Sequence, residues 1–258
     1  SAIVISAGFS EIGIPGKELE DELKKICSKY SISLLGPNCL GLINTSSKLN
    51  ASFAEYYPSS GNIAFLSQSG AFGSALLDFS AKKHLGIGQF VSVGNKAGVD
   101  EVDFVSEWLK DEGNKVIALY IEEFSRGLDL IECIKKSEVR KPIILLNPGS
   151  SDAAKGAISS HTGSMAGESK LIKVAFKKLG VIQVESIEDM FNYLMMFSWN
   201  DTNNVSDDKS VTILTNAGGP GIMLTDLIEN KGLPLTVLSD KTKEELSKVL
   251  PSSASNHN

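Results

Sequence analysis

Short apolar runs alternate with amphipathic segments through the middle of the chain, and this alternation constrains the fold more than any other feature. The apolar runs predict strands over 62–66, 87–93, 116–121, 142–146 and 181–184. The segments between and after them predict helices over 71–83, 102–110, 128–136, 168–178 and 187–197. Strands that alternate with helices predict a parallel sheet covered on both faces. The nearly continuous apolar character of the strands fits such a sheet.

Further α/β pieces flank this central part. Before it, residues 2–6 and 33–35 predict strands on either side of a helix near 17–29. After it, residues 211–214 and 235–238 predict strands, with helices over 222–230 and 241–249. Because residues 44–60 and 199–210 are polar, we expect connections there.

We therefore expect tandem doubly wound α/β domains: an incomplete one over 1–58, a central one over 59–200 and the start of another over 210–258. The chain opens on a strand and stops soon after a helix, so we expect a fragment of a longer polypeptide.

Composition excludes several classes of function. The net charge of −6 argues against a nucleic-acid-binding surface, and no apolar run approaches the roughly 18 residues of a membrane span. The three cysteines, Cys27, Cys39 and Cys133, show no C-x-x-C spacing, which favours a reducing, cytoplasmic setting. Because histidine and cysteine are not clustered, we expect no metal site in this chain.

A long loop of small residues, 150–167, carries a single histidine, His161. Long loops inside compact domains are uncommon and are often functional. A lone imidazole there is either incidental or a group that must move. To act as a nucleophile, His161 needs one free ring nitrogen and a carboxylate that holds the other. Glu122 and Glu123 end a predicted strand, where open α/β sheets place their sites, although a solvated strand end explains them equally well.

Two strand-to-helix loops are candidates for anion binding: Ser67-Gln68-Ser69-Gly70 and Gly218-Gly219-Pro220-Gly221. The N-terminus of a helix presents free N–H groups and the positive end of its dipole. Turn geometry alone also favours Ser and Gly in such loops. The P-loop pattern is absent, and the third glycine of G-x-G-x-x-G is missing. A serine hydrolase that uses Ser69 stays open but has little support, because position 67 is Ser and no G-x-S-x-G elbow forms.

Several stretches together carry a family likeness. They are Ile5-Ser6-Ala7-Gly8-Phe9, Gly36-Pro37-Asn38-Cys39-Leu40-Gly41, Leu66-Ser67-Gln68-Ser69-Gly70, Val93-Gly94-Asn95-Lys96, Ser160-His161-Thr162-Gly163-Ser164-Met165-Ala166-Gly167 and Asn216-Ala217-Gly218-Gly219-Pro220-Gly221. With these stretches in this order, the chain resembles the NDP-forming acyl-CoA synthetases, especially the ADP-forming acetyl-CoA synthetases. It is more distantly similar to the alpha subunit of succinyl-CoA synthetase. The resemblance implies Rossmann-like and flavodoxin-like domains in tandem.

The resemblance also implies an activity. Members of the family interconvert acyl-CoA, ADP and phosphate with a carboxylic acid, CoA and ATP, through an acyl phosphate and a phosphohistidine. His161 would carry the phosphoryl group, and Glu122, or second to it Glu123, would orient the imidazole. The residues that would grip the phosphate are Ser67, Gln68, Ser69, Gly70, Gly218, Gly219 and Gly221. Those that would bind CoA are Ala7, Gly8, Phe9, Asn38 and Cys39, with Cys39 near the CoA thiol without acting as a nucleophile.

The implied partners are CoA, a small carboxylic acid and an ATP-grasp domain or subunit that binds ATP or ADP with Mg. An oligomer is expected, with no nucleic acid and no membrane as partner. The alternative is an acyl-CoA-binding regulatory region of a protein acetyltransferase. Such regions commonly lack the histidine, so His161 favours the enzyme.

Overall fold

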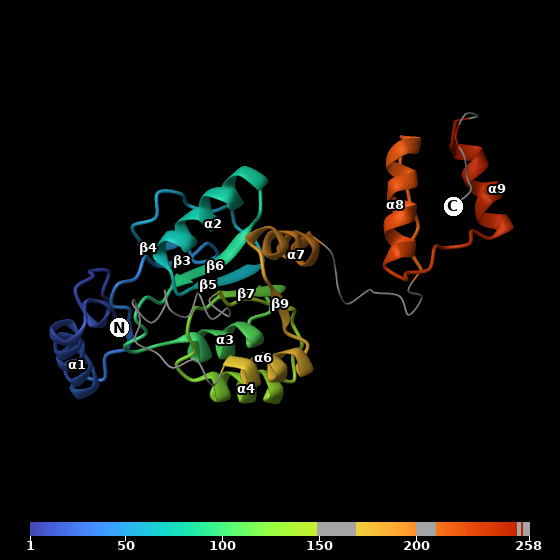
Figure 1. Cartoon of the computed structure of the whole chain (residues 1–258). Helices are drawn as coiled ribbons and strands as arrows, with labels where there is room; N and C mark the ends of the chain where they lie inside the picture. The colour runs from blue at the N-terminus through green and yellow to red at the C-terminus, as the bar shows by residue number, and fades with distance from the viewer. Residues whose placement is uncertain (149–168, 200–209, 252–253, 255–258) are drawn as a thin grey trace. The chain divides into compact units, whose positions relative to one another are not determined.

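The computed structural model describes residues 1–148, 169–199, 210–251 and 254. The chain divides into two compact units, Ser1–Asp201 and Thr202–Asn258, which are considered separately here (Figure 1). His161 lies outside the described residues.

Within the described part of the first unit, one seven-stranded sheet has the strand order β4-β3-β6-β5-β7-β8-β9. Its parallel strands are β5 (Ile63–Ser67), β6 (Ile87–Ser92), β7 (Val116–Tyr120), β8 (Ile143–Leu146) and β9 (Ile182–Val184). Taken in chain order, these strands are arranged 2-1-3-4-5, which is the flavodoxin-like order. The predicted α/β fold class is confirmed.

Helices cover both faces of this sheet (Figure 1). On one face lie α2 (Gly70–Lys83) and α7 (Ile187–Trp199), and on the other α3 (Glu101–Lys110), α4 (Gly127–Lys136) and α6 (Ser169–Lys178). Successive strand residues serve opposite faces: Phe65 packs with the α2 side and Leu66 with the α3 side. Both are completely buried, which explains the continuous apolar runs.

A hairpin at the edge of the sheet departs from the prediction. β3 (Gly41–Asn44) and β4 (Leu49–Ser52) are antiparallel, and β3 pairs antiparallel with β6. Part of the region 44–60, expected to be a connection, is therefore built into the sheet, and the sheet is mixed rather than wholly parallel. The pairing with β6 explains this difference. Ile43 lies opposite Phe90 on β6 and is 1% exposed, so one buried apolar side chain holds this short and mostly polar segment in the sheet.

The N-terminal segment, residues 1–38, forms a small α/β piece beside this sheet. β1 (Ala2–Ile3) pairs in parallel with β2 (Leu34–Leu35), and between them lie the short 3-10 helix η1 (Ser10–Ile12) and α1 (Ile14–Lys29). The loop that follows β6 is hydrogen-bonded to the N-terminal segment through the main chain. Its N–H groups donate to three carbonyls at 2.9 Å each: Asn95 to Pro37, Ala97 to Gly36 and Val99 to Leu34. Close approach requires glycine at position 94, where a Cβ would lie 2.2 Å from a carbonyl oxygen.

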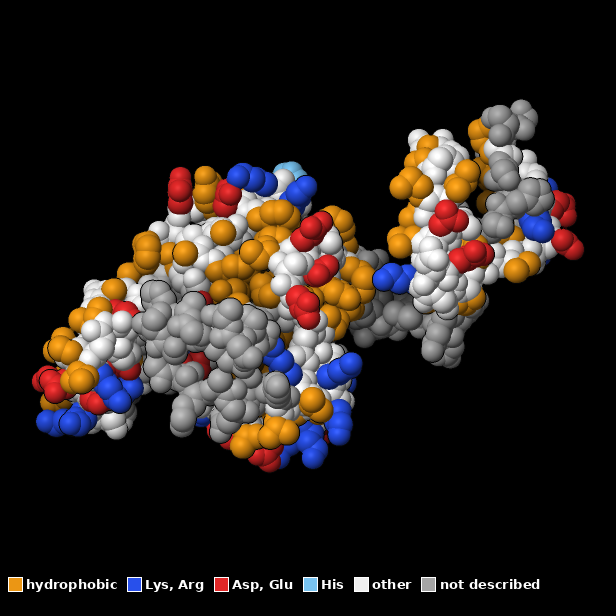
Figure 2. Space-filling view, viewed as in Figure 1, with side chains coloured by type: hydrophobic (Ala, Val, Ile, Leu, Met, Phe, Trp, Pro, Cys, Tyr) orange, Lys and Arg blue, Asp and Glu red, His pale blue; other side chains and the backbone are white. Residues whose placement is uncertain are grey.

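The second unit contains α8 (Gly218–Asn230) and α9 (Asp240–Val249) among its described residues. The strands predicted over 211–214 and 235–238 are reduced there to one parallel bridge between Val211 and Leu235. Leu214 and Val237 are more than nine-tenths exposed. Apolar side chains also gather on α8 (Figure 2). None of the helices in the described residues is long and apolar enough to cross a membrane.

Candidate functional site

A cavity of about 990 Å³ opens at the carboxyl ends of the parallel strands. It lies where the strand order reverses, between β5 and β7, and open α/β sheets bind their ligands at such a switch point. Its walls come from the loops after four neighbouring strands and from the N-terminal segment. The lining includes Ser10, Glu11, Asn38, Cys39, Gln68, Ser69, Gly70, Ala71, Asn95, Lys96, Tyr120, Glu122, Glu123, Ser125 and Pro148.

One wall is the start of α2. Ser69 is the N-cap: its backbone is extended, and its Oγ accepts a hydrogen bond from the N–H of Phe72 at 3.3 Å. The first N–H group with an acceptor four residues back is that of Gly73, which donates to the Ser69 carbonyl. Gly70 and Ala71 come before it and line the cavity, so their N–H groups are available to an anion. Ser67 is different, because it is fully buried and donates its hydroxyl to the Ser69 carbonyl at 2.5 Å. Ser67 therefore shapes the loop and does not reach the cavity wall.

The acidic pair after β7 lies against this wall. Gln68 Oε1 accepts hydrogen bonds from the main-chain N–H groups of Glu122 and Glu123 at 3.0 and 3.1 Å. Gln68 also extends the pairing of β5 with β7, since its own N–H donates to the Tyr120 carbonyl at 2.9 Å. The structure thus brings the predicted anion loop and the predicted carboxylates into one cavity.

Tyr120, the last residue of β7, adds a hydroxyl to the same cavity. Its ring stacks on Phe72 with the centroids 4.0 Å apart, which fixes it against the first turn of α2. Burial, and then the negative charge of Glu122, raises the pKa of Tyr120 to about 12. The hydroxyl therefore keeps its proton at neutral pH and is a hydrogen-bond donor there.

A buried ion pair lies behind the acidic residues. Lys96 Nζ is 3.2 Å from Glu101 Oε2, and the two side chains are 4% and 0% exposed. Lys96 Nζ also donates to the main-chain carbonyl of Glu123, and Glu101 Oε1 accepts from the N–H of Ser125 at 3.0 Å. Sequence reasoning missed this pair: Lys96 drew notice only as part of a family motif, and Glu101 looks like any acidic residue in the first turn of a helix.

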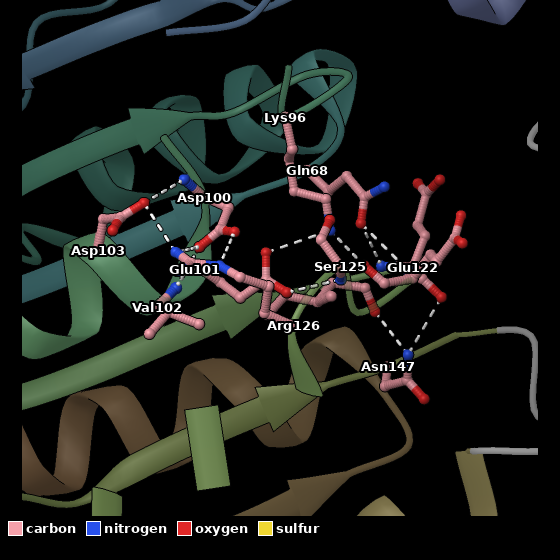
Figure 3. A network of polar contacts seen from close by, with 12 residues as sticks. Gln68, Lys96, Asp100, Glu101, Val102, Asp103, Glu122, Ser125, Arg126 and Asn147 are labelled. Atoms are coloured by element: carbon pink, nitrogen blue, oxygen red, sulfur yellow. Dashed lines mark hydrogen bonds and ion pairs between the residues drawn. The ribbon is translucent and has the colours of Figure 1, made fainter. Parts of the chain in front are cut away.

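A second ion pair joins Arg126, which follows the loop of the acidic pair, to Asp100, the N-cap of α3 (Figure 3). The Arg126 guanidinium contacts both oxygens of Asp100 at 2.6 and 2.7 Å and also reaches Asp103 at 3.0 Å. Burial on its own would raise the pKa of Asp100. The hydrogen bonds from Arg126 and from the Val102 N–H outweigh it, so the pKa of that carboxyl is lowered.

The opposite wall comes from the N-terminal segment and centres on Asn95. Its Nδ2 lies within hydrogen-bond distance of Ser10 Oγ (3.1 Å), Glu11 Oε2 (2.6 Å) and Glu20 Oε2 (3.0 Å), and its Oδ1 accepts from Asn38 Nδ2 at 3.2 Å. Of these residues, Asn38 was predicted to bind CoA and Asn95 drew notice only as part of a family motif. Ser10, Glu11 and Glu20 were not singled out, because Ser10 and Glu11 lie in η1 and Glu20 in α1, away from the strand ends.

The residues predicted to bind CoA fall into two groups. Asn38 and Cys39 line the cavity, whereas Ala7, Gly8 and Phe9 are absent from its described walls. The N–H groups of Gly8 and Phe9 donate instead to Glu11 Oε1, at 2.5 and 3.1 Å. Cys39 is 3% exposed, and burial raises the pKa of its thiol, which agrees with a small buried apolar group rather than a nucleophile.

The glycines of the other predicted anion loop lie in the second unit. Gly218, Gly219 and Gly221 form the first turn of α8, and a Cβ at Gly218 or Gly219 would meet no atom within 4 Å. That this helix end and the start of α2 grip the same phosphate stays a prediction. The described residues contain no group of side chains arranged to hold a metal ion.

Comparison with known proteins gives this site its family context. The model of the succinyl-CoA ligase-like flavodoxin domain matches residues 60–197. The chain belongs to this family. The match spans the central sheet from β5 to α7, which includes the start of α2, the acidic pair and the Lys96–Glu101 pair.

Individual relatives extend the likeness to the whole chain. The ADP-forming acetate–CoA ligase I of Archaeoglobus fulgidus is 41% identical over 258 residues, which cover 100% of this chain and 37% of that protein. The alpha subunit of ADP-forming acetate–CoA ligase II of Pyrococcus furiosus is 41% identical over 249 residues, or 96% of this chain and 53% of that one.

A solved structure agrees with these relatives. The acetyl-coenzyme A synthetase 1 of Candidatus Korarchaeum cryptofilum, in complex with phosphate and ADP, superposes with a TM-score of 0.87 at 37% identity. The superposition covers 100% of this chain and 55% of that one. This succinyl-CoA ligase-like chain therefore spans between about a third and about half of the relatives it matches.

Proposed function

We propose that this chain is the CoA-ligase part of an ADP-forming acyl-CoA synthetase, an acid–thiol ligase. The complete enzyme would interconvert acyl-CoA, ADP and phosphate with a carboxylic acid, CoA and ATP. One observation carries the proposal: a single cavity at the switch point of the sheet joins the N-cap of α2, the acidic pair and the loop containing Asn38 and Cys39. Two relatives that match all or nearly all of this chain are named ADP-forming acetate–CoA ligases, which supports the same reaction.

The phosphoryl group would pass through two covalent carriers. Phosphate attacks the thioester carbonyl of acyl-CoA, and CoA leaves as its thiolate, so that an acyl phosphate forms. A ring nitrogen of His161 then attacks phosphorus, and the carboxylate leaves. The phosphohistidine finally donates its phosphoryl group to ADP and returns the free imidazole. The first step forms a carbon–oxygen bond and breaks the carbon–sulfur bond of the thioester. Each of the two later steps forms one bond to phosphorus and breaks one, so atoms and charge balance.

The described side chains supply positioning and charge for these steps. A phosphoryl group carries close to two negative charges and is best met by N–H donors, which Gly70 and Ala71 present at the start of α2. Glu122 would accept a hydrogen bond from the other ring nitrogen of His161 and stabilise the cation that forms during attack. Tyr120 keeps its proton and would hold Glu122 in place.

The remaining partners follow from the same proposal. CoA would approach along the wall that carries Asn38 and Cys39, with Ala7, Gly8 and Phe9 of the N-terminal segment beside it. ATP or ADP with Mg would bind to an ATP-grasp part, as the family resemblance implies. The second helix end, at Gly218, Gly219 and Gly221, would take part when the phosphohistidine moves. We propose an oligomeric, cytoplasmic enzyme.

Turnover of the complete enzyme tests this function. With acetyl-CoA, ADP, Mg and phosphate, ATP should form in a one-to-one ratio with free CoA, and omission of phosphate should stop both. A wider set of acyl-CoA esters then defines the acyl group. Release of CoA without ATP would contradict the proposal. Binding of acetyl-CoA with no turnover at all would favour a regulatory acyl-CoA-binding region.

A further inference from the structure

The acidic segment, residues 121–125, has no helix or strand of its own, and side chains from three other loops hold its main chain (Figure 3). Gln68 follows β5, Lys96 follows β6 and Asn147 follows β8. Asn147 Nδ2 donates to the Ile121 carbonyl at 2.7 Å, and Lys96 Nζ donates to the carbonyl of Glu123. The loop after each neighbouring strand therefore contributes one side chain to the same stretch of main chain.

Gln68 makes the contact closest to the two carboxylates. Its Oε1 accepts from the N–H groups of both Glu122 and Glu123. Since both partners are N–H donors, the atom between them has to be the oxygen of the amide, which fixes the orientation of the side chain. The main chain of Gln68 is held by Tyr120, so the amide bridges the start of α2 and the acidic segment.

We propose that Gln68 is a positioning residue for phosphoryl transfer, acting through the main chain of Glu122 and Glu123. The inference rests on the proposed function, in which one of those carboxylates orients His161. If the Gln68 oxygen is removed, two N–H groups lose their acceptor and the segment shifts. A displacement of about 1 Å at a catalytic group costs about 10²-fold in rate.

This role differs from the one that the family resemblance implies. A phosphate-binding Gln68 would use its side-chain N–H groups, and its loss would weaken phosphate binding whatever stands at positions 122 and 123. A positioning Gln68 works only through the carboxylates, so its loss should matter little once the operative carboxylate is gone. The two roles thus predict opposite results in a double-mutant cycle.

The experiment measures phosphohistidine formation in the complete enzyme from acyl-CoA and labelled phosphate. The variants are Gln68→Met, Glu122→Gln, Glu123→Gln and the two doubles that combine Gln68→Met with each. We expect Gln68→Met alone to slow labelling about 10²-fold, with the KM for phosphate changed less than about threefold. One of the two carboxylates, Glu122 or Glu123, orients His161 in the proposed function. When Gln68→Met is combined with the loss of that carboxylate, we expect almost no further decrease in the labelling rate. Gln68→Asn, whose shorter amide does not span both N–H groups, should fold normally and show a smaller loss of the same kind.

Gln89→Met is the matched control. Gln89 also bridges two partners, since its Oε1 accepts from Trp108 Nε1 at 2.7 Å and its Nε2 donates to Asp111, but it lies on β6 away from the cavity. Its loss should leave the labelling rate unchanged. The positioning role is wrong if the Gln68 and carboxylate effects multiply, or if Gln89→Met slows labelling equally. If wild type labels and neither carboxylate variant is slower, this inference falls together with the role proposed for Glu122, while the proposed reaction stands. An unlabelled wild type overturns the proposed function as well.

Discussion

Replacement of His161 by Asn is expected to abolish acid-labile phosphorylation of the complete enzyme and, with it, ATP formation. Asn keeps a polar side chain of related shape but has no nucleophilic ring nitrogen, so the acyl phosphate has no acceptor. Among the described residues, the histidine is His84, which is the left-handed C-cap at the end of α2. The measurement is labelling with radioactive phosphate and acyl-CoA, followed by acid and alkali treatment.

The control is His84→Asn. His84 has φ of 54° at the C-terminus of α2, and Asn adopts this left-handed conformation readily. This variant should fold and label like wild type. Full labelling of His161→Asn would show that another residue carries the phosphoryl group and would remove His161 from the mechanism.

Lys96→Met is expected to destabilise the first unit by about 3–5 kcal/mol, because removal of one partner leaves the carboxylate of Glu101 buried and unpaired. Glu101 is completely buried, and its other oxygen is already used by the N–H of Ser125. The double variant Lys96→Met/Glu101→Leu should recover much of this loss, since an apolar pair replaces an uncompensated charge.

Urea unfolding followed by tryptophan fluorescence measures this effect. Trp108 is 3% exposed and packs in the core of the first unit, so its emission reports the unfolding of that unit. The matched control is Lys82→Met, which breaks the exposed Lys82–Asp78 pair (2.7 Å) on α2 and should leave the free energy of unfolding nearly unchanged. Equal losses for Lys96→Met and Lys82→Met would contradict the account of a buried pair.

The sequence predicts the central sheet well, because each buried strand is a continuous apolar run and each helix shows apolar residues at helical spacing. The hairpin β3–β4 was not predicted from these patterns. Its anchor, Ile43, gains its burial from a partner on β6 nearly fifty residues away, and the strand around it is short. The strands predicted in the second unit are reduced, within its described residues, to the bridge between Val211 and Leu235, and the apolar side chains of Leu214 and Val237 are exposed.

In the cavity, too, features set by local sequence patterns could be predicted, whereas contacts between distant loops could not. Ser69, Gly70 and Glu122 follow strand ends, and the rule that parallel strands share one carboxyl edge is enough to expect them together. The Lys96–Glu101 pair and the Gln68 bridge depend on how loops from different strands approach each other. No local pattern encodes that approach. The sequence therefore predicts which residues meet at the edge of the sheet, but not how they are held there.

Amide resonances at the start of α2 test most directly whether this cavity receives the phosphoryl group. In a nitrogen-15-labelled sample of the chain, titration with phosphate should move the amide protons of Gly70 and Ala71 downfield, because a helix N-terminus donates these N–H groups to the anion. The amide of Gly180, in the turn before β9 and outside the cavity, should stay in place. If Gly70 and Ala71 do not move at phosphate concentrations that support turnover, the phosphate binds elsewhere and the account of this site is wrong.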